Sequence, residues 1–163
     1  MTAADLIAAL HLEPHPVEGG YFRETWRSKV EVAGPHGMRS AGTAIYYLLT
    51  PDSYSALHRL RTDEVFHFYL GDPVEMLQLW PDGSIKTIAL GNDLGAGQHV
   101  QCIVPAGVWQ GSRLCPGGQF ALLGATVAPG FDYADYEGGE RASLLVDFPD
   151  AAAWIRKLTP EAR

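Results

Sequence analysis

Between residues 41 and 127 the chain is a series of short apolar runs separated by turns rich in glycine and proline. No helical pattern lies between these runs, so a parallel sheet, which needs crossover helices, is excluded. Short strands at this spacing are typical of an antiparallel sandwich or barrel. The predicted strands cover residues 44–49, 54–61, 64–70, 74–80, 85–90, 100–104, 108–114 and 120–127.

The two ends of the chain are predicted to be helical. Thr2, followed three residues later by Asp5, forms a capping box for a helix near the start. Residues 140–148 and 151–158 form two more short helices, and residues 21–30 have the mixed pattern of an edge strand. With 163 residues, 47% of them hydrophobic, the sequence predicts one folded domain and excludes an intrinsically disordered chain.

Composition also limits the possible partners. Twelve basic and nineteen acidic residues give a net charge of −7, which disfavours a nucleic-acid-binding surface. No apolar run approaches the roughly 18 residues of a membrane span, and the amino terminus has no signal-peptide pattern. The two cysteines, Cys102 and Cys115, are too few for a disulfide framework or an all-thiolate zinc site. We therefore expect a cytoplasmic protein that contacts neither nucleic acid nor membrane.

Two ionisable side chains are predicted to meet inside the barrel. His58 lies near the end of one strand and Glu64 at the start of the next, so the two can meet across the turn. Gln110, just after a tight turn, can approach from a third strand. An imidazole and a carboxylate can bind a metal, or act as base and acid near neutral pH. Because burying ionisable groups is costly, we interpret His58 and Glu64 as a ligand site.

The spacing around His58 resembles the first motif of the cupin superfamily. That motif has two histidines one residue apart, then a glutamate, then a glycine after six further residues. This chain has His58, Leu60 in place of the second histidine, Glu64 and Gly71. The motif's opening glycine is replaced by Asp52.

The second cupin motif ends in Pro-x-Gly-x-x-His, and Pro105, Gly107 and Gln110 hold those places here. Its closing asparagine is replaced by Leu114. Of the usual cupin metal ligands, the resemblance leaves only His58 and Glu64 in place, with Gln110 as a weak neutral donor. A divalent metal held by these three residues is therefore one alternative, and less expected than in ordinary cupins.

Six segments match a more specific pattern, in order and over nearly the whole chain. They are residues 15–24, 43–49, 55–59, 63–73, 104–110 and 127–131. By these segments the chain resembles the cupin-5 (DUF985) family of RmlC-like cupins, with Val17 and Val65 as mild departures. The resemblance implies an all-β fold: a double-stranded β-helix, or jelly-roll barrel, with short terminal helices, forming a single cupin domain over residues 1–163. It also implies a homodimer, but no particular reaction.

The orientation of the strand that contains Glu64 leaves two arrangements open. Simple alternation places Glu64 on one face of the strand and both His67 and Tyr69 on the other. His67 would then point outward, towards a dimer contact. A bulge, or a strand that begins after Glu64, would instead turn His67 and Tyr69 inward, where both are candidate catalytic residues.

Four further residues are candidates for contact with a ligand. Tyr21 and Glu24 lie in a polar and aromatic segment that could line the mouth of the barrel, and a solvated edge strand explains them equally well. Trp109 and Phe131 could stack on a planar ligand, although large aromatic side chains more often belong to a core or an interface.

Three functions follow from these residues. In the first, which we prefer, the barrel binds a small polar or sugar-like molecule through hydrogen bonds from His58, Glu64 and Gln110. In the second, an RmlC-like epimerase or isomerase uses His58 as general base and a tyrosine such as Tyr69 as acid. In the third, His58, Glu64, Gln110 and also His67 hold a divalent metal that supports catalysis. The sequence leaves open whether any turnover occurs.

Overall fold

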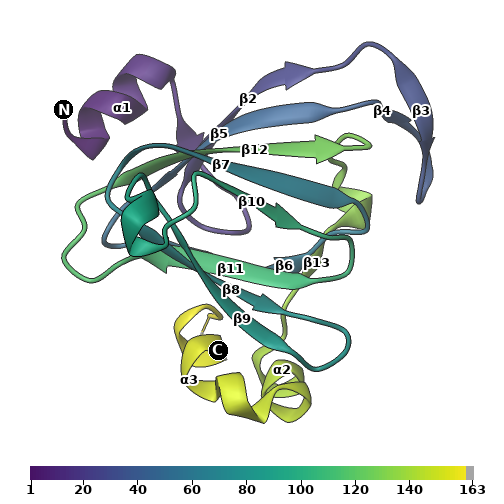
Figure 1. The fold of residues 1–163 in the computed structure, drawn as a ribbon. Helices are drawn as coiled ribbons and strands as arrows, with labels where there is room; N and C mark the ends of the chain where they lie inside the picture. The colour runs from purple at the N-terminus through teal and green to yellow at the C-terminus, as the bar shows by residue number, and fades with distance from the viewer. Residues whose placement is uncertain (161–163) are drawn as a thin grey trace.

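The computed structural model describes residues 1–160 and folds them into two facing antiparallel sheets (Figure 1). This is the predicted jelly-roll architecture. The first sheet has the order β1 (Glu13–Pro14), β2 (Tyr21–Arg27), β5 (Thr43–Leu49), β12 (Ala121–Ala128), β7 (Asp63–Gly71) and β10 (Gln101–Val104). The second sheet has the order β13 (Glu137–Gly138), β6 (Tyr54–Arg59), β11 (Trp109–Leu114), β8 (Val74–Leu79) and β9 (Ile85–Leu90).

Short helices cover the outer faces of both sheets. Helix α1 (Ala3–Leu10) has the predicted capping box, in which Thr2 and Asp5 bond each other's backbone N–H groups, and its Leu6 packs on the six-stranded sheet. Helices α2 (Arg141–Asp147) and α3 (Ala152–Lys157) pack below the five-stranded sheet, with the 3-10 turn η3 (Pro149–Ala151) between them (Figure 1). Burial on both faces explains why several strands are apolar throughout instead of alternating.

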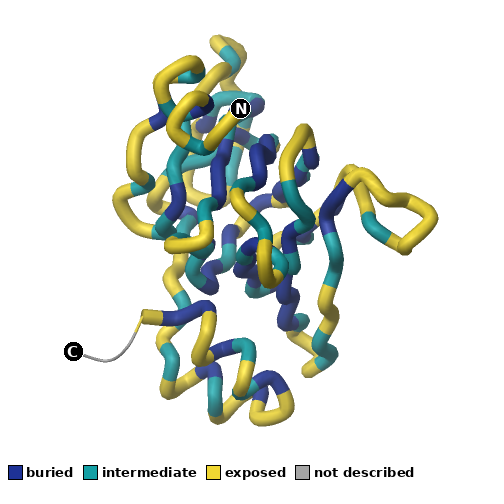
Figure 2. The backbone as a smooth tube through the Cα atoms, turned by 90° about the vertical axis from the view of Figure 1, so that its left-hand side faces the viewer, coloured by how far each residue is buried: buried dark blue, intermediate teal, exposed yellow. Residues whose placement is uncertain are grey.

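The interior between the sheets is divided into two parts. At one end Leu49, Phe68, Met76 and Leu123 pack into a continuous hydrocarbon core, seen as dark blue segments at the centre of Figure 2. At the other end the same strands β5, β7 and β12 line a cavity instead. The 3-10 turn η2 (Tyr133–Asp135) contributes to this second end, where the candidate site lies.

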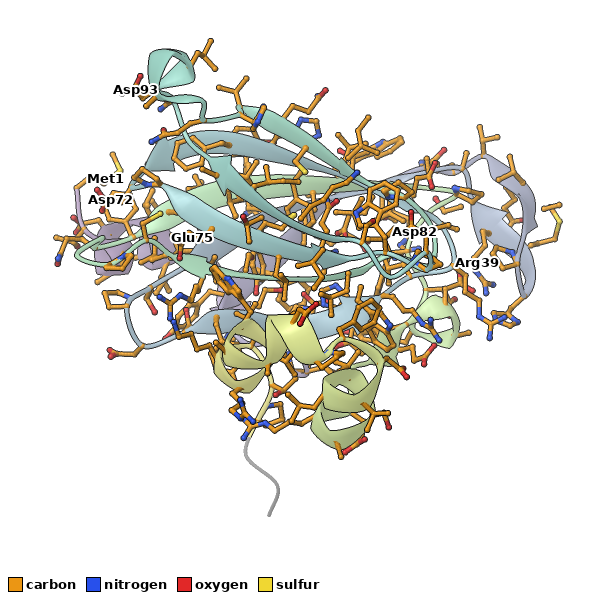
Figure 3. All side chains as sticks on the ribbon, turned by 60° about the horizontal axis from the view of Figure 1, so that its bottom comes forward. Met1, Arg39, Asp72, Glu75, Asp82 and Asp93 are labelled. Carbon is orange, nitrogen blue, oxygen red and sulfur yellow. The ribbon has the colours of Figure 1, made fainter. Side chains whose placement is uncertain are left out.

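One hairpin projects from the body of the molecule. Strands β3 (Glu31–Gly34) and β4 (Gly37–Ser40) pair only with each other and extend beyond the barrel, mostly exposed (Figures 1 and 2). Arg39, labelled in Figure 3, ties the hairpin to η2 through a buried two-pronged contact with Asp135. Over residues 1–160, no helix has the length and apolar character needed to span a membrane.

Candidate functional site

His58 faces the barrel interior because strand β6 contains a bulge. His58 pairs with Gln110 of β11, but the next matched pair is Ser55 with Ser112, so β6 has one extra residue there. Leu57 within the bulge packs against the terminal helices, while His58 turns to the barrel interior. A side chain at Gly111 would lie 2.9 Å from the Ser55 carbonyl oxygen, so glycine is needed opposite the bulge.

Glu64 faces the same interior from strand β7. The strand alternates as expected, with Glu64, Phe66 and Phe68 buried on the inner face. His67 and Tyr69 lie on the outer face, where His67 Nε2 is 3.2 Å from Thr126 Oγ1 and the two rings stack at 6.4 Å. Of the two arrangements that the sequence left open, β7 has the one that keeps His67 and Tyr69 outside the cavity.

Gln110 bridges His58 and Glu64. Its amide nitrogen lies 3.2 Å from His58 Nε2 and also donates to a carboxylate oxygen of Glu64. All three side chains are buried. The amide oxygen of Gln110 has no hydrogen-bond partner within the described part of the chain, so one acceptor of this cluster is left unused.

A fourth polar group, Glu18, enters the cluster from the loop before β2. Its carboxylate oxygen Oε1 lies 3.6 Å from His58 Nε2 and 3.8 Å from His15 Nε2. The loop is held from both sides: the Tyr47 hydroxyl donates to the Gly19 carbonyl, and Ala56 of the β6 bulge donates to the Glu18 carbonyl. Gly19 has φ of +91°, and a Cβ there would lie 2.4 Å from the Tyr54 carbonyl oxygen.

The hydrogen bonds of the two histidines fix opposite tautomers around Glu18. His58 Nδ1 lies 2.8 Å from the Ala56 carbonyl, which can only accept, so in the neutral ring Nε2 carries the lone pair. His15 Nδ1 receives backbone N–H groups from Val17 and Glu18, so its Nε2 carries the hydrogen. Glu18 therefore lies between an acceptor on one side and a donor on the other.

Burial sets the protonation of this cluster. It raises the pKa of both Glu18 and Glu64 to about 7, against the opposing effects of His15 on Glu18 and of His58 on Glu64. Burial also lowers the pKa of His58, an effect that the Glu64 carboxylate partly offsets, and lowers that of His15. Near neutral pH the imidazoles are therefore neutral, and each carboxyl group can hold or release a proton.

The cavity has a volume of about 400 Å³ and is mostly apolar apart from these groups. Phe22, Tyr47 and Phe66 form aromatic walls, and Leu60 stands where the second cupin histidine would be. Glu18 and Glu64 both line it. Buried polar groups converging on an apolar cavity are typical of a small-molecule site.

The mouth of the cavity carries an ion pair and an aromatic series. The Arg27 guanidinium donates two hydrogen bonds to the Glu24 carboxylate, at 2.7 and 2.9 Å, and also donates to the Phe131 carbonyl. The Phe131 ring contacts Tyr133 edge to face, and Tyr133 contacts Tyr136 in the same way. Tyr136 in turn stacks on His58, with 5.1 Å between the ring centroids. The buried contact of Arg39 with Asp135 holds this segment in place.

The structure brings together only some of the predicted residues. His58, Glu64 and Gln110 form the cluster, with Glu24 and Phe131 at the mouth. Tyr21 instead packs with the residues under α1, and its aromatic ring does not line the barrel cavity. Trp109 packs on the terminal helices beneath the Arg59 guanidinium, 4.4 Å from the ring centroid. Tyr21 and Trp109, like His67 and Tyr69, thus lie apart from the cluster.

Sequence analysis missed Glu18 and His15. Both lie in residues 15–24, a segment that carries the family resemblance and from which only Tyr21 and Glu24 were predicted to contact a ligand. The available signal was the three-residue spacing of an imidazole and a carboxylate directly before two consecutive glycines. Such a loop can approach other backbone closely, as Gly19 and Gly20 do, but the spacing alone does not reveal which strand it approaches.

Comparisons with known proteins agree with the architecture. The model of a family described as "Cupin superfamily (DUF985)" matches residues 4–138. The uncharacterized protein YML079W of Saccharomyces cerevisiae is 37% identical over 153 residues, which cover 83% of this chain and 76% of the yeast protein. A hypothetical protein from Leishmania major is 34% identical, with a TM-score of 0.93 over 99% of this chain and 100% of that one. Protein SO0799 from Shewanella oneidensis is 36% identical, with a TM-score of 0.91 over 99% of each chain.

More distant structures share the fold alone. A dTDP sugar isomerase from Desulfovibrio desulfuricans is 14% identical, with a TM-score of 0.53 over 73% of this chain and 83% of that one. Oxalate decarboxylase from Bacillus subtilis is 16% identical, with a TM-score of 0.57 over 93% of this chain and 38% of that one. The decarboxylase is described as having Mn(II) centres, so a divalent metal is one possibility that the fold raises.

The residues of this chain do not fit such a metal. Among the residues that the structure describes, no three His, Cys, Asp or Glu side chains are placed to hold an ion together. Leu60 offers no donor atom, and Gln110 presents an amide N–H group to His58 and Glu64. Catalytic metal sites usually have three good protein ligands, and of the usual cupin ligand positions only those of His58 and Glu64 hold such a residue here.

Proposed function

The chain belongs to the DUF985 family of the cupin superfamily, and from that premise we propose that it binds a small polar, sugar-like molecule inside its barrel. The observation that carries the proposal is a cavity lined by the buried carboxyl groups of Glu18 and Glu64, with His58 in contact with Glu18 and Gln110 in contact with Glu64. Burying carboxyl groups is unfavourable unless they have hydrogen-bond partners, and the hydroxyl groups of a ligand would supply further donors to their oxygen atoms.

The cavity suits such a ligand in size and in lining. A volume of about 400 Å³ lies within the range of small-molecule sites. A sugar ring has apolar faces and a polar rim. The faces can pack on Phe22 and Phe66 while the rim reaches Glu18 and Glu64.

Thermal stabilisation by a panel of free sugars and sugar alcohols tests the proposal. A ligand at about 100 times its dissociation constant stabilises the fold by about 2.7 kcal/mol, which raises the melting temperature by roughly 5 to 10 °C for a chain of this size. The substitution Ala125→Leu narrows the cavity from β12 and should abolish the shift. The control is Ala44→Leu. Ala44 lies on β5, next to Ile45, which pairs with Ala125, but it is on the outer face of the sheet, away from the cavity. Stabilisation that survives Ala125→Leu, or none by any panel member, contradicts the proposal.

One observation favours a second candidate, proton transfer on the bound molecule. Glu18 lies between the lone pair of His58 Nε2 and the hydrogen of His15 Nε2, so the His15 N–H group faces its ionised form and the His58 lone pair faces its protonated form. Ionised Glu18 would remove a proton from a ligand carbon next to a carbonyl, leaving an enediolate, and would then return the proton to a carbon, so that no oxidant is needed. Exchange of a carbon-bound hydrogen for solvent deuterium, lost in Glu18→Gln, is the expected signature, and no exchange with any bound keto-sugar counts against it.

A further inference from the structure

Resting on the proposed function, we infer that the molecule bound in the barrel is a cation, with an ammonium group seated between Glu18 and Glu64. The charges of the cavity lining carry the inference. Glu18, Glu24, Glu64 and Asp132 are acidic, while Arg27 is the one lysine or arginine among the lining residues that the structure describes. Glu24 is paired with Arg27, and Asp132 lies 3.9 Å from Arg39, so Glu18 and Glu64 are the acids of the lining that no lysine or arginine of the described residues neutralises. When these two groups are ionised, a neutral ligand leaves their charge unbalanced.

Arg27 is not free to bind an anionic ligand. Its Nε and Nη2 atoms donate to Glu24 at 2.9 and 2.7 Å, and both of its Nη atoms donate to the Phe131 carbonyl at 3.3 Å. A carboxylate or phosphate on a ligand would have to displace this two-pronged pair. The positive charge of Arg27 is thus paired with Glu24 at the mouth, and the described lining has no other lysine or arginine to bind an anion.

The closed end offers acceptors in the number that an ammonium group needs. Glu18 and Glu64 both line the cavity and together have four carboxylate oxygens, of which one on Glu64 accepts a hydrogen bond from Gln110. An ammonium group has three N–H donors and no acceptor. A hydroxyl group has one donor, so it would satisfy one acceptor of this set and leave the others unchanged.

The walls add a second attraction for a cation. Phe22, Tyr47, Phe66, Phe131 and Tyr133 line the space between the mouth and the acids. Aromatic faces attract organic cations within about 6 Å, most strongly where water is excluded. Carboxylates at one end of an aromatic cavity are therefore a suitable environment for an amine attached to a small apolar or sugar-like ring.

Three probes of matched shape separate charge from size: cyclohexylamine, cyclohexanol and cyclohexanecarboxylate, titrated into the protein by NMR at about pH 8. At that pH the amine is protonated and the two carboxyl groups of the site are largely ionised. The amine is expected to bind at least about tenfold more tightly than the alcohol, and the carboxylate more weakly than the alcohol. Glu18→Gln and Glu64→Gln should each reduce the amine's advantage several-fold, while Glu31→Gln on the exposed hairpin should leave it unchanged.

The outcomes separate this inference from the proposed function. Binding of all three probes in the cavity with similar affinity, or tighter binding of the carboxylate, overturns the ammonium assignment and leaves the small-molecule site standing. Absence of binding by every probe, together with absence of stabilisation by the sugar panel, overturns both. An amine preference that persists in both Glu18→Gln and Glu64→Gln places the cation elsewhere and also contradicts the inference.

Discussion

The two ends of the barrel interior are built from the same strands but differ in what those strands contribute. On β5, Leu49 is fully buried in hydrocarbon while Ile45, four residues earlier on the same inner face, lines the cavity. On β7, Phe68 belongs to the packed end and Glu64 to the hollow one. The packed end stabilises the fold, whereas the hollow end holds buried acids and unfilled volume. The same strands thus supply a stabilising core at one end and a cavity at the other, and substitutions can change either end separately.

The largest difference between the two ends should appear on truncation of their apolar side chains. Leu49→Ala removes a fully buried side chain from a close-packed core, and we expect a loss of about 3 to 4 kcal/mol in the free energy of unfolding. Ile45→Ala enlarges a cavity that already exists, so we expect a loss of about 1 to 2 kcal/mol. Urea denaturation of both variants measures the contrast, and equal losses would show that the cavity end is as tightly packed as the core.

The buried acids of the hollow end should destabilise the folded protein above neutral pH, where they ionise. Burial raises the pKa of Glu64 from 4.5 to about 7, so the folded state binds this proton more tightly than the unfolded state does. Its contribution to stability is complete below about pH 4.5 and is lost as the pH rises through 7. Glu64→Gln stays uncharged throughout. It should match the wild type in acid and be more stable by about 3 kcal/mol at pH 8.

Denaturation curves from about pH 5 to pH 8 check this prediction. The groups that face Glu64 are His58, Glu18 and Gln110, with Tyr47 nearby, and all are retained in the variant. His58 acts in the opposite direction because burial lowers its pKa, so its contribution to stability is lost as the pH falls below 6.5. In Glu64→Gln the carboxylate that partly offsets this lowering is lost, so the effect of His58 differs between the two proteins at acidic pH. Between pH 7 and pH 8 His58 is neutral in both, and the growth of the difference there reports on Glu64. A difference that does not grow with pH would mean that Glu64 is ionised in the folded protein at all these pH values.

A smaller loss of stability is expected from a substitution in the loop that carries Glu18, where it contacts strand β6. Gly19→Ala places a side chain at φ of +91° and within 2.4 Å of the Tyr54 carbonyl, which should cost about 2 kcal/mol and displace Glu18. Gly97→Ala is the matched control, because Gly97 also has a positive φ but open space around its Cα. We expect the control to lose about 1 kcal/mol and to keep the amine preference that Gly19→Ala loses. NMR titration with cyclohexylamine distinguishes them; equal affinities would show that the loop tolerates movement.

Most of the fold was predictable because its elements produce local sequence patterns. Turn residues and apolar runs identified the strands, and Thr2 with Asp5 identified the first helix. Simple alternation on β7 gave one of the two arrangements that the sequence left open, with Glu64 and His67 on opposite faces, and the structure has that arrangement. These features depend on residues a few positions apart, which a single sequence displays directly.

The rest of the site depends on contacts between distant segments. The bulge in β6 shifts Ser55 and Leu57 relative to simple alternation, and it is specified partly by Gly111 on another strand. Glu18 joins His58 across 40 positions, through a loop held by β5 and β6. Trp109 was a candidate because its ring could stack on a planar ligand, but it lies on the opposite side of β11 from Gln110, as adjacent residues of a strand do, and packs on the terminal helices.

The smallest effect on stability should come from the mouth, where the charge preference of the cavity is set. Glu24 and Arg27 are both partly exposed, so Glu24→Gln should change the free energy of unfolding by less than about 1 kcal/mol. It should also release the Arg27 guanidinium, which then becomes available to an anion. Cyclohexanecarboxylate should therefore bind several-fold more tightly to Glu24→Gln than to the wild type, while cyclohexylamine loses affinity. If neither probe responds, the ion pair does not control access, and the anionic character of the cavity arises from its closed end alone.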